Sequence, residues 1–401
     1  MPIDLLKRAA FVALFFVVAF ISFSNSLFEI ASAVLIALSL VSLVRSKSYT
    51  VAKDLFFAFA AFYLMMNLLS LTQTAYAAAS LRGIFKVLKN LLLCFSAFYV
   101  IDSESRFKRI FDWILWVALL IGLDALIQGL TGVELIRSRP MTAYVEDTKR
   151  LTGPFHHAND FSAYLSFVTV PFFAVATGGL KLFPPKKYVW FVGGALVALV
   201  CLLGTYSRGA WLAVASALVL FVIFKRSKAV AALLLLTMVG AAFFAPLTIK
   251  ARMVSIWDVR NGTVLERKTL WKESLRMIDK SPWLGLGVNT YAKNEPLYKS
   301  TGIEIDQQYA HNGYLQMAAE IGILGLLSFL LTVGYFLWAS LISFLKSEHI
   351  LMQTMGSGLV LGIFSFLVHS ATDTDLQSLL LVNLLWLAMG IAWAGKRLVE
   401  K

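Results

Sequence analysis

The chain has 401 residues, of which 59% are apolar and 15% charged, whereas soluble globular chains are about 45–50% apolar and about 25% charged. This composition excludes an ordinary soluble domain, because the polar side chains could not cover so much apolar surface. The formal net charge of +13 comes from basic residues dispersed among apolar segments, so it favours a bilayer with anionic lipid or phosphate partners and argues against nucleic acid.

The apolar segments are long and continuous rather than alternating, which predicts membrane-spanning helices and argues against an outer-membrane barrel. The first of them follows Lys7 and Arg8 like a secretory signal, but no small-residue cleavage site follows, so we interpret it as a retained span. We therefore expect an all-α polytopic membrane protein with about twelve spans, each needing roughly 20 mostly apolar residues. In chain order these are residues 9–24, 27–44, 54–71, 82–101, 107–130, 160–179, 188–206, 209–225, 229–247, 314–345, 350–371 and 376–395.

The short connections between spans set the orientation through their Lys and Arg content. With the N-terminus in the cytoplasm, the outer connections at 25–26, 72–80 and 371–375 contain no Lys or Arg. The inner connections contain basic clusters at 45–47, 106–109, 181–187, 225–228 and 396–397. This asymmetry predicts that both termini are cytoplasmic and that residues 131–159 and 248–313 lie outside.

The outer segments divide the chain into three parts. Residues 1–247 hold the first nine spans with the outer loop 131–159, residues 248–313 form a loop subdomain, and residues 314–401 hold the last three spans. We expect the loop subdomain to be partly helical, with a helix from about Glu266 to Asp279 and a turn over 281–287.

Three basic residues begin the fourth predicted span, against the usual inward bias of Lys and Arg. Arg82, Lys86 and Lys89 stand at positions i, i+4 and i+7, on one face of a helix whose N-terminus adds partial positive charge. The alternative to an anion site is that their long side chains reach back to lipid headgroups. Because three cations inside an apolar span are costly without a partner, we favour an anion site at the outer surface.

Two further arginines lie on the predicted outer side. Arg208 follows a span in a turn rich in Gly and Ser, where it is either an interface anchor or a ligand-binding residue. Arg267 lies four residues before Trp271, on the side of the apolar stripe formed by Trp271, Leu275 and Ile278. An arginine on a packed face normally has an anionic partner, so we expect one for Arg267.

Among the five histidines, His311 is the candidate general base. It lies where the large outer loop re-enters the membrane, and a neutral imidazole there can accept a proton. His349 and His369 are interpreted as structural. His156 and His157 are adjacent and have no third ligand at suitable spacing, so no metal site is expected. Hydrogen bonding of either histidine to a substrate is a weaker alternative.

An ordered set of short motifs lies between about residues 150 and 325. It consists of Gly153-Pro154-Phe155 with Asn159, Ser207-Arg208-Gly209, Arg267 with Trp271, Ser281-Pro282-Trp283-Leu284-Gly285-Leu286-Gly287, and His311-Asn312 with Gly322. In order and spacing this set resembles the O-antigen ligase and O-antigen polymerase family of bacterial membrane glycosyltransferases. The spans before residue 150 resemble the family only in hydropathy.

The resemblance implies a GT-C-type enzyme of the bacterial inner membrane, with a periplasmic active site, no metal and no cofactor. Such enzymes transfer a glycan from undecaprenyl diphosphate to lipid A–core oligosaccharide in ligases, or to another undecaprenyl-linked repeat in polymerases. The resemblance implies that Arg208 and Arg267 bind the diphosphate and that His311 takes the proton of the acceptor hydroxyl. Asn159 and Asn312 are weaker candidates for sugar binding, and Arg82, Lys86 and Lys89 could assist with the diphosphate.

Three functions remain in competition at this point. We prefer a ligase, expected to be a monomer, because about twelve spans with one dominant late loop fit it, whereas polymerases often have two comparable outer loops. A lipid-linked oligosaccharide transporter would predict ionisable residues near the membrane midplane and broken helices in both halves. Asp124, the main buried-looking acid, lies instead toward the outer end of the fifth span.

Overall fold

The computed structural model of the chain describes residues 2–47, 54–141, 144–145, 148–178, 183–226, 231–232, 235, 240, 243, 246–254, 262–299 and 309–401. These residues are helical apart from loops and one small antiparallel hairpin of β1 (Tyr144–Val145) and β2 (Thr148–Lys149). The longer helices are α1 (Ile3–Phe20), α2 (Asn25–Ser46), α3 (Leu55–Ser70), α4 (Ala77–Val100), α5 (Glu104–Thr131), α6 (Ala158–Gly178), α7 (Pro185–Gly204), α8 (Arg208–Lys225), α11 (Gly262–Lys280), α13 (Gly313–Lys346), α14 (Ile350–His369) and α15 (Leu379–Val399). The shorter ones are α10 (Leu247–Val254), α12 (Tyr291–Asn294) and the 3₁₀ turn Glu295–Leu297.

Nine of the described helices are long and apolar enough to cross a membrane, which confirms the prediction of a helical multi-pass membrane protein. These nine are α2, α4 to α8 and α13 to α15. Helices α1 and α3 coincide with two further predicted spans, although α3 is shorter, at 16 residues. The span predicted at 229–247 falls mostly outside the described residues, so the described helices do not establish a count of twelve.

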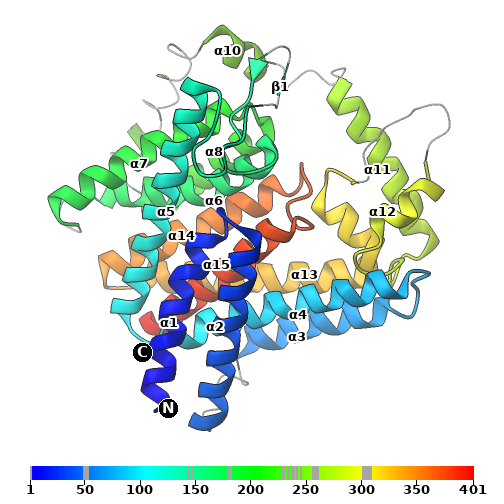
Figure 1. The fold of residues 1–401 in the computed structure, drawn as a ribbon, viewed down its shortest axis with the longest axis horizontal. Helices are drawn as coiled ribbons and strands as arrows, with labels where there is room; N and C mark the ends of the chain where they lie inside the picture. Colours follow the sequence, from blue (N-terminus) through cyan, green and yellow to red (C-terminus); the bar gives the residue numbers. More distant parts are fainter. Residues whose placement is uncertain are drawn as a thin grey trace.

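Close contacts between helices build the transmembrane core around α14 and α15 (Figure 1). Helix α14 packs against α6, where a Cβ on Gly362 would lie 2.3 Å from the carbonyl oxygen of Phe167. Helix α15 packs against α4 in the same way, since a Cβ on Gly390 would lie 2.2 Å from the carbonyl oxygen of Cys94. Without a hydrophobic driving force between helices in lipid, such small residues allow the close packing that holds helices together.

The two ends of the chain lie on the same side of the molecule. Arg397, near the end of α15, donates to the carbonyl oxygens of Phe98 and Ile101. The Nζ of Lys7 in α1 is 3.8 Å from the Oδ2 of Asp102, in the same α4–α5 connection. Helix α15 begins at Leu379, so the preceding residues 370–378 lie at the end of α15 opposite to Arg397. The start of α13 contacts these residues and therefore lies on the side of the molecule opposite to the termini.

Helix α13 is interrupted by a backbone joint with the turn at 281–287. Gly322 has a φ of 74° and a ψ of 176°, which breaks the helical hydrogen-bond ladder. The freed groups pair with the turn instead: Leu286 N–H donates to Ala319 O at 2.9 Å, and Gly287 N–H donates to Glu320 O at 2.8 Å. We call residues 281–287 and 319–323 the glycine joint.

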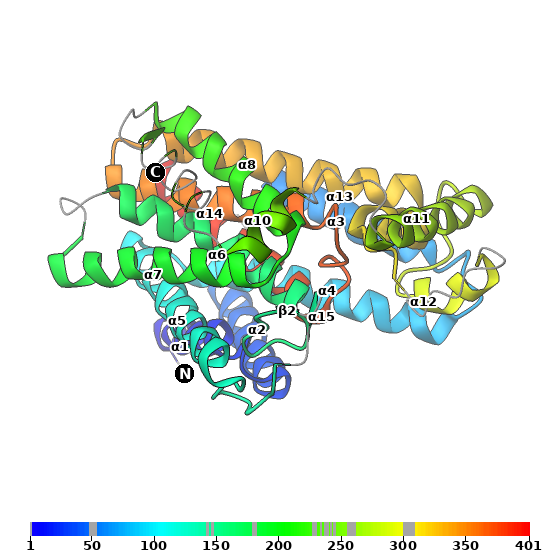
Figure 2. The same ribbon diagram turned by 90° about the horizontal axis from the view of Figure 1, so that it is seen from above.

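The glycine joint leaves no room for side chains at two of its positions. A Cβ on Gly322 would lie 2.1 Å from the carbonyl oxygen of Trp283, and one on Gly285 would lie 2.4 Å from the backbone of Glu320. Both glycines also have positive φ, which side chains disfavour. The joint therefore fixes α11 and α12 over one end of α3, α4 and α13, away from α7, as Figures 1 and 2 show.

Candidate active site

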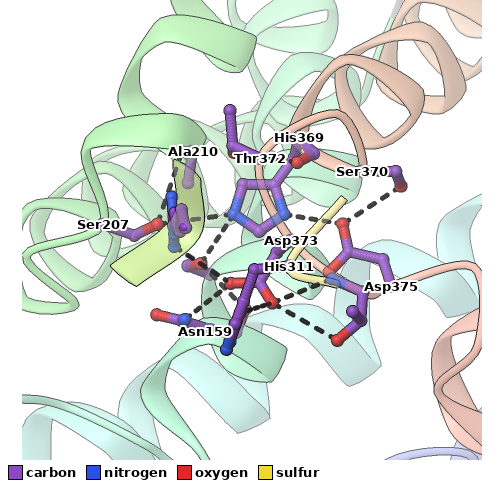
Figure 3. A network of polar contacts seen from close by, with 12 residues as sticks. Asn159, Ser207, Ala210, His311, His369, Ser370, Thr372, Asp373 and Asp375 are labelled. Atoms are coloured by element: carbon purple, nitrogen blue, oxygen red, sulfur yellow. Dashed lines mark hydrogen bonds and ion pairs between the residues drawn. The ribbon is translucent and has the colours of Figure 1, made fainter. Parts of the chain in front are cut away.

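The connection between α14 and α15, residues 370–378, meets the first turns of α6, α8 and α13 (Figure 3). The N–H of Gly313 donates to the carbonyl oxygens of Ser370 and Asp373, at 2.8 and 2.9 Å. A Cβ on Gly209 would lie 2.1 Å from the Oγ1 of Thr372, so the start of α8 packs directly on this connection. Three helix starts and one loop thus form a single polar cluster.

Asp373 is the centre of this cluster and is only 6% exposed. Its Oδ1 lies 3.2 Å from the Nδ1 of His311 and accepts from the N–H of Thr374 at 2.9 Å. Its Oδ2 accepts from the Nδ2 of Asn159 at 2.6 Å and lies 3.8 Å from an Nη2 of Arg267. Four segments that are far apart in the sequence therefore meet at one carboxylate.

The surroundings of Asp373 keep its carboxylate ionised. Burial alone raises the pKa of Asp373, but the hydrogen bond with His311 and the nearby charges of His311, His369 and Arg267 outweigh it and lower the pKa overall. An ionised carboxylate only accepts, so the Nδ1 of His311 carries the hydrogen of their contact. When the imidazole is neutral, its Nε2 is then the atom that can take a proton.

The backbone around His311 holds the imidazole in this position. His311 has a φ of 46°, a left-handed conformation that is uncommon outside glycine. The next residue, Asn312, is the N-cap of α13, and its Oδ1 accepts from the N–H groups of Tyr314 and Leu315 at 3.1 and 3.0 Å. Asn312, a predicted sugar-binding residue, therefore uses its amide oxygen to start the helix that places His311.

Arginines surround the Asp373 cluster, and two of them were not predicted. Arg150 donates from Nη2 to the Oδ1 of Asn159 at 2.7 Å and from Nε to the carbonyl oxygen of Thr205 at 2.6 Å. Burial and the positive charges of Arg252 and Arg267 lower the pKa of Arg150 to about 10. Arg252 donates from Nε to the carbonyl oxygen of Tyr206 at 3.4 Å, next to the contact of Arg150 at Thr205. Such a group of guanidinium groups is favourable for a multiply charged anion.

Arg208 lies at the same surface, as the first residue of α8. The hydroxyl of Ser207 caps this helix by accepting from the N–H of Ala210 at 3.4 Å. Arg208 directly precedes Gly209, which packs on the α14–α15 connection. The structure therefore brings the predicted residues Arg208, Arg267 and His311 to one side of the molecule. Asn159 joins them as the bridge between Arg150 and Asp373.

A second histidine–aspartate pair lies buried beside the first. The Nδ1 of His369 is 2.7 Å from the Oδ2 of Asp375, and the two side chains are 1% and 2% exposed. The Nε2 of His369 lies 3.3 Å from the hydroxyl of Ser162 and 3.4 Å from that of Ser207. This pair ties the starts of α6 and α8 to the α14–α15 connection, which fits the structural interpretation of His369.

Helix α11 carries Arg267 and begins earlier than predicted, at Gly262. Its packed face includes Leu270, Ser274, Met277 and Ile278. The predicted apolar stripe was therefore correct at Ile278 and wrong at Leu275, which is 49% exposed. Arg267 still lies on the packed face, because it is three residues before Leu270. The prediction of an anionic partner for Arg267 is confirmed by Asp373.

The basic residues of α4 have other partners. The Nζ of Lys89 lies 2.6 Å from the Oε1 of Glu29 in α2. The Nζ of Lys86 donates to the Oδ1 of Asn289 at 3.0 Å, and Arg82 is exposed. The structure thus pairs the two lysines with neighbouring elements of the scaffold instead of with groups of the Asp373 cluster.

Sequence reasoning missed Asp373, Arg150 and Arg252. The connection 371–375 was noted only for its lack of Lys and Arg, although it contains both Asp373 and Asp375. Two carboxylates in so short a loop between apolar spans were a usable signal. Arg252 gave no such signal, because its relation to Arg150 depends on how the outer segments fold over the helices.

A helical membrane protein with a polar, arginine-rich cluster at one surface is therefore the class that the fold and the site define. Residues 193–330 match the model of the O-antigen ligase family. This part of the chain is therefore similar to the O-antigen ligase family, in agreement with the resemblance of the motifs. The matched region includes Arg208, Arg267 and His311, whereas Asp373 lies outside it. A search of curated proteins found no significant match.

Proposed function

We propose that the protein is an O-antigen ligase of GT-C type. It transfers a polysaccharide from undecaprenyl diphosphate to lipid A–core oligosaccharide on the periplasmic face of the inner membrane, with both termini in the cytoplasm. The observation that carries the proposal is the contact between His311 and ionised Asp373 beside a group of arginines. The family match supports the same reaction class.

In this proposal the arginines bind the diphosphate of the donor. Arg208 and Arg267 act with Arg150 and Arg252, because guanidinium groups match phosphate oxygens with two parallel hydrogen bonds. A diphosphate that is neutralised in this way is a good leaving group, so the reaction needs positive charge more than a general acid. Arg267 would exchange part of its contact with Asp373 for the donor, since the 3.8 Å separation is longer than a hydrogen bond.

His311 is the proposed general base. Its Nε2 takes the proton of the acceptor hydroxyl while the hydroxyl oxygen attacks the anomeric carbon of the first donor sugar. The bond from that carbon to the diphosphate oxygen breaks, and undecaprenyl diphosphate leaves with the bonding electron pair. The new bond forms on the opposite face of the sugar, so the configuration inverts. Asp373 holds the imidazole in the required tautomer and stabilises the imidazolium, which then releases its proton to water.

Complementation of a ligase-deficient Gram-negative strain tests the proposal. Expression of the chain should restore long-chain lipopolysaccharide bands on a gel, and His311→Ala and Arg208→Ala should abolish them while the protein remains in the membrane. His349→Ala is the matched control and should ligate normally. Longer lipid-linked chains on an unmodified lipid A–core would identify a polymerase, and unimpaired ligation by His311→Ala would remove the proposed base.

A further inference from the structure

A small polar cavity of about 140 Å³ lies beside the Asp373 cluster. Its polar lining comes from Asn25, Arg137, His156, Asp160 and Ser378, and Phe155 contributes an apolar wall. Asn25, Asp160 and Ser378 belong to the starts of α2, α6 and α15. Asp160 directly follows Asn159, which binds Asp373. Among the residues that the structure describes, none of the four site arginines lines this cavity.

The polar groups of the cavity have hydrogen-bonding capacity beyond their contacts within the fold. Ser378 occupies the N-cap position of α15, yet its hydroxyl makes no capping hydrogen bond. Arg137 donates from Nε to Phe23 O and from Nη2 to Ser22 O, which uses two of the five guanidinium hydrogens. The first turn of α15 also lines the cavity, and N–H groups at a helix start lack partners within the helix.

His156 lines the cavity and can donate a hydrogen bond. Its Nε2 lies 3.1 Å from the Nη2 of Arg139, and because a guanidinium can only donate, Nε2 is the acceptor. The hydrogen of the neutral imidazole is then on Nδ1. Burial and the charges of Arg139 and Arg137 lower the pKa of His156, so the imidazole remains neutral at pH 7.

The lining suits a ligand with many hydroxyl groups. The guanidinium of Arg137 opposes an ammonium group, and the carboxyl group of Asp160 can accept a hydrogen bond whether or not it carries a proton. A hydroxyl both donates and accepts, so one ligand can satisfy Asp160 together with Arg137 and His156. Phe155, with Pro154 and Leu379, offers an apolar surface for C–H groups. Because one water needs roughly 10–15 Å³ by this measure, the cavity holds on the order of ten water-sized groups, about as many as the heavy atoms of one sugar ring.

We propose that this cavity binds one sugar unit of the acceptor glycan. The inference rests on the proposed function, since it takes His311 as the base for the acceptor hydroxyl. In this proposal the donor sugar next to the diphosphate lies beside the four site arginines, none of which lines the cavity among the described residues. The acceptor is therefore the substrate whose sugar occupies the cavity.

Kinetics of the purified chain in lipid nanodiscs test the proposal. Asn25→Ala, His156→Ala and Ser378→Ala should each raise the KM for lipid A–core about tenfold, since each removes a hydrogen bond to the sugar, and the KM for the lipid-linked donor should stay within twofold. His157→Ala is the matched control, because the exposed His157 does not line the cavity. Unchanged acceptor KM in all three variants, or an equal rise in both KM values, would overturn the proposal.

A binding measurement separates this inference from the proposed function. Deacylated core oligosaccharide, labelled with a fluorophore, is titrated onto His311→Ala protein with and without Ser378→Ala, and thermal melting confirms that both variants are folded. Roughly tenfold weaker binding with Ser378→Ala supports the cavity even if no transfer occurs with any donor. Equal binding by the two variants refutes the cavity even if the wild-type chain is an active ligase.

Discussion

The Asp373 cluster and the basic face of α4 both concentrate positive charge, but they differ in how the charges are compensated. On α4, regular helical spacing aligns three cations, and Lys86 and Lys89 each contact a group on a neighbouring element. At Asp373, cations from separate segments converge on one buried carboxylate. Convergence of distant segments is difficult to explain by packing alone, so it is the better indicator of a site.

The largest expected effect is the loss of glycan transfer in His311→Ala. A positioned general base contributes roughly 10²–10⁴-fold to a rate, so kcat should fall by at least about 100-fold while the KM for the donor changes little. The measurement is transfer of radiolabelled glycan to lipid A–core by purified protein. A fall of less than tenfold would show that His311 is not the general base.

The next effect is expected in Asp373→Asn. An amide in place of the carboxylate no longer fixes the imidazole tautomer or stabilises the imidazolium, so we expect kcat to fall by roughly 100-fold. Asp373→Glu keeps a carboxylate and should recover part of the rate if the longer side chain still contacts the Nδ1 of His311. If Asp373→Asn lowered only the amount of folded protein, with normal kcat per folded molecule, Asp373 would be a structural residue.

Arg267→Gln and Lys89→Gln compare the two basic regions directly. Loss of a charge-assisted hydrogen bond to the diphosphate should raise the KM for the donor about 10- to 100-fold in Arg267→Gln. Lys89→Gln removes only a contact with Glu29, and partly exposed pairs are worth about 0–1 kcal/mol, so its donor KM should stay within about threefold. A comparable rise in the donor KM in both variants would show that α4 is part of the diphosphate site.

The smallest expected effect is on stability at low pH. The pKa of Asp373 is lower in the folded protein than its ordinary value, so the ionised carboxylate stabilises the fold at pH values above that ordinary value, near 4. This stabilisation is lost as pH falls toward the folded-state pKa. Between pH 7 and pH 3.5, the melting temperature of the wild-type protein should therefore fall by more than that of Asp373→Asn. An equal loss would show that Asp373 is not selectively ionised.

Local pattern in the sequence predicted the helices, the large outer loop and the chemistry-bearing residues of that loop. It located His311 and the packed side of Arg267, because helical periodicity and span boundaries are local properties. It could not locate Asp373 at His311, since 62 residues separate them and only the packing of α13 against α14 and the α14–α15 connection brings them together. The basic residues of α4 show the opposite limit. Their helical spacing is regular, but it does not specify which groups of other elements they contact.

The break at Gly322 decouples the outer end of α13 from the part that crosses the bilayer. The outer end carries His311 at its start, and its backbone is bonded to the turn below α11. Because the helical hydrogen-bond ladder is interrupted at Gly322, tilting of the lower part, as bilayer thickness varies, should bend α13 below the joint and leave the bonded outer end in place. Lateral stress in the lipid would then leave the distance between His311 and Arg267 unchanged, so catalysis could tolerate membranes of different composition.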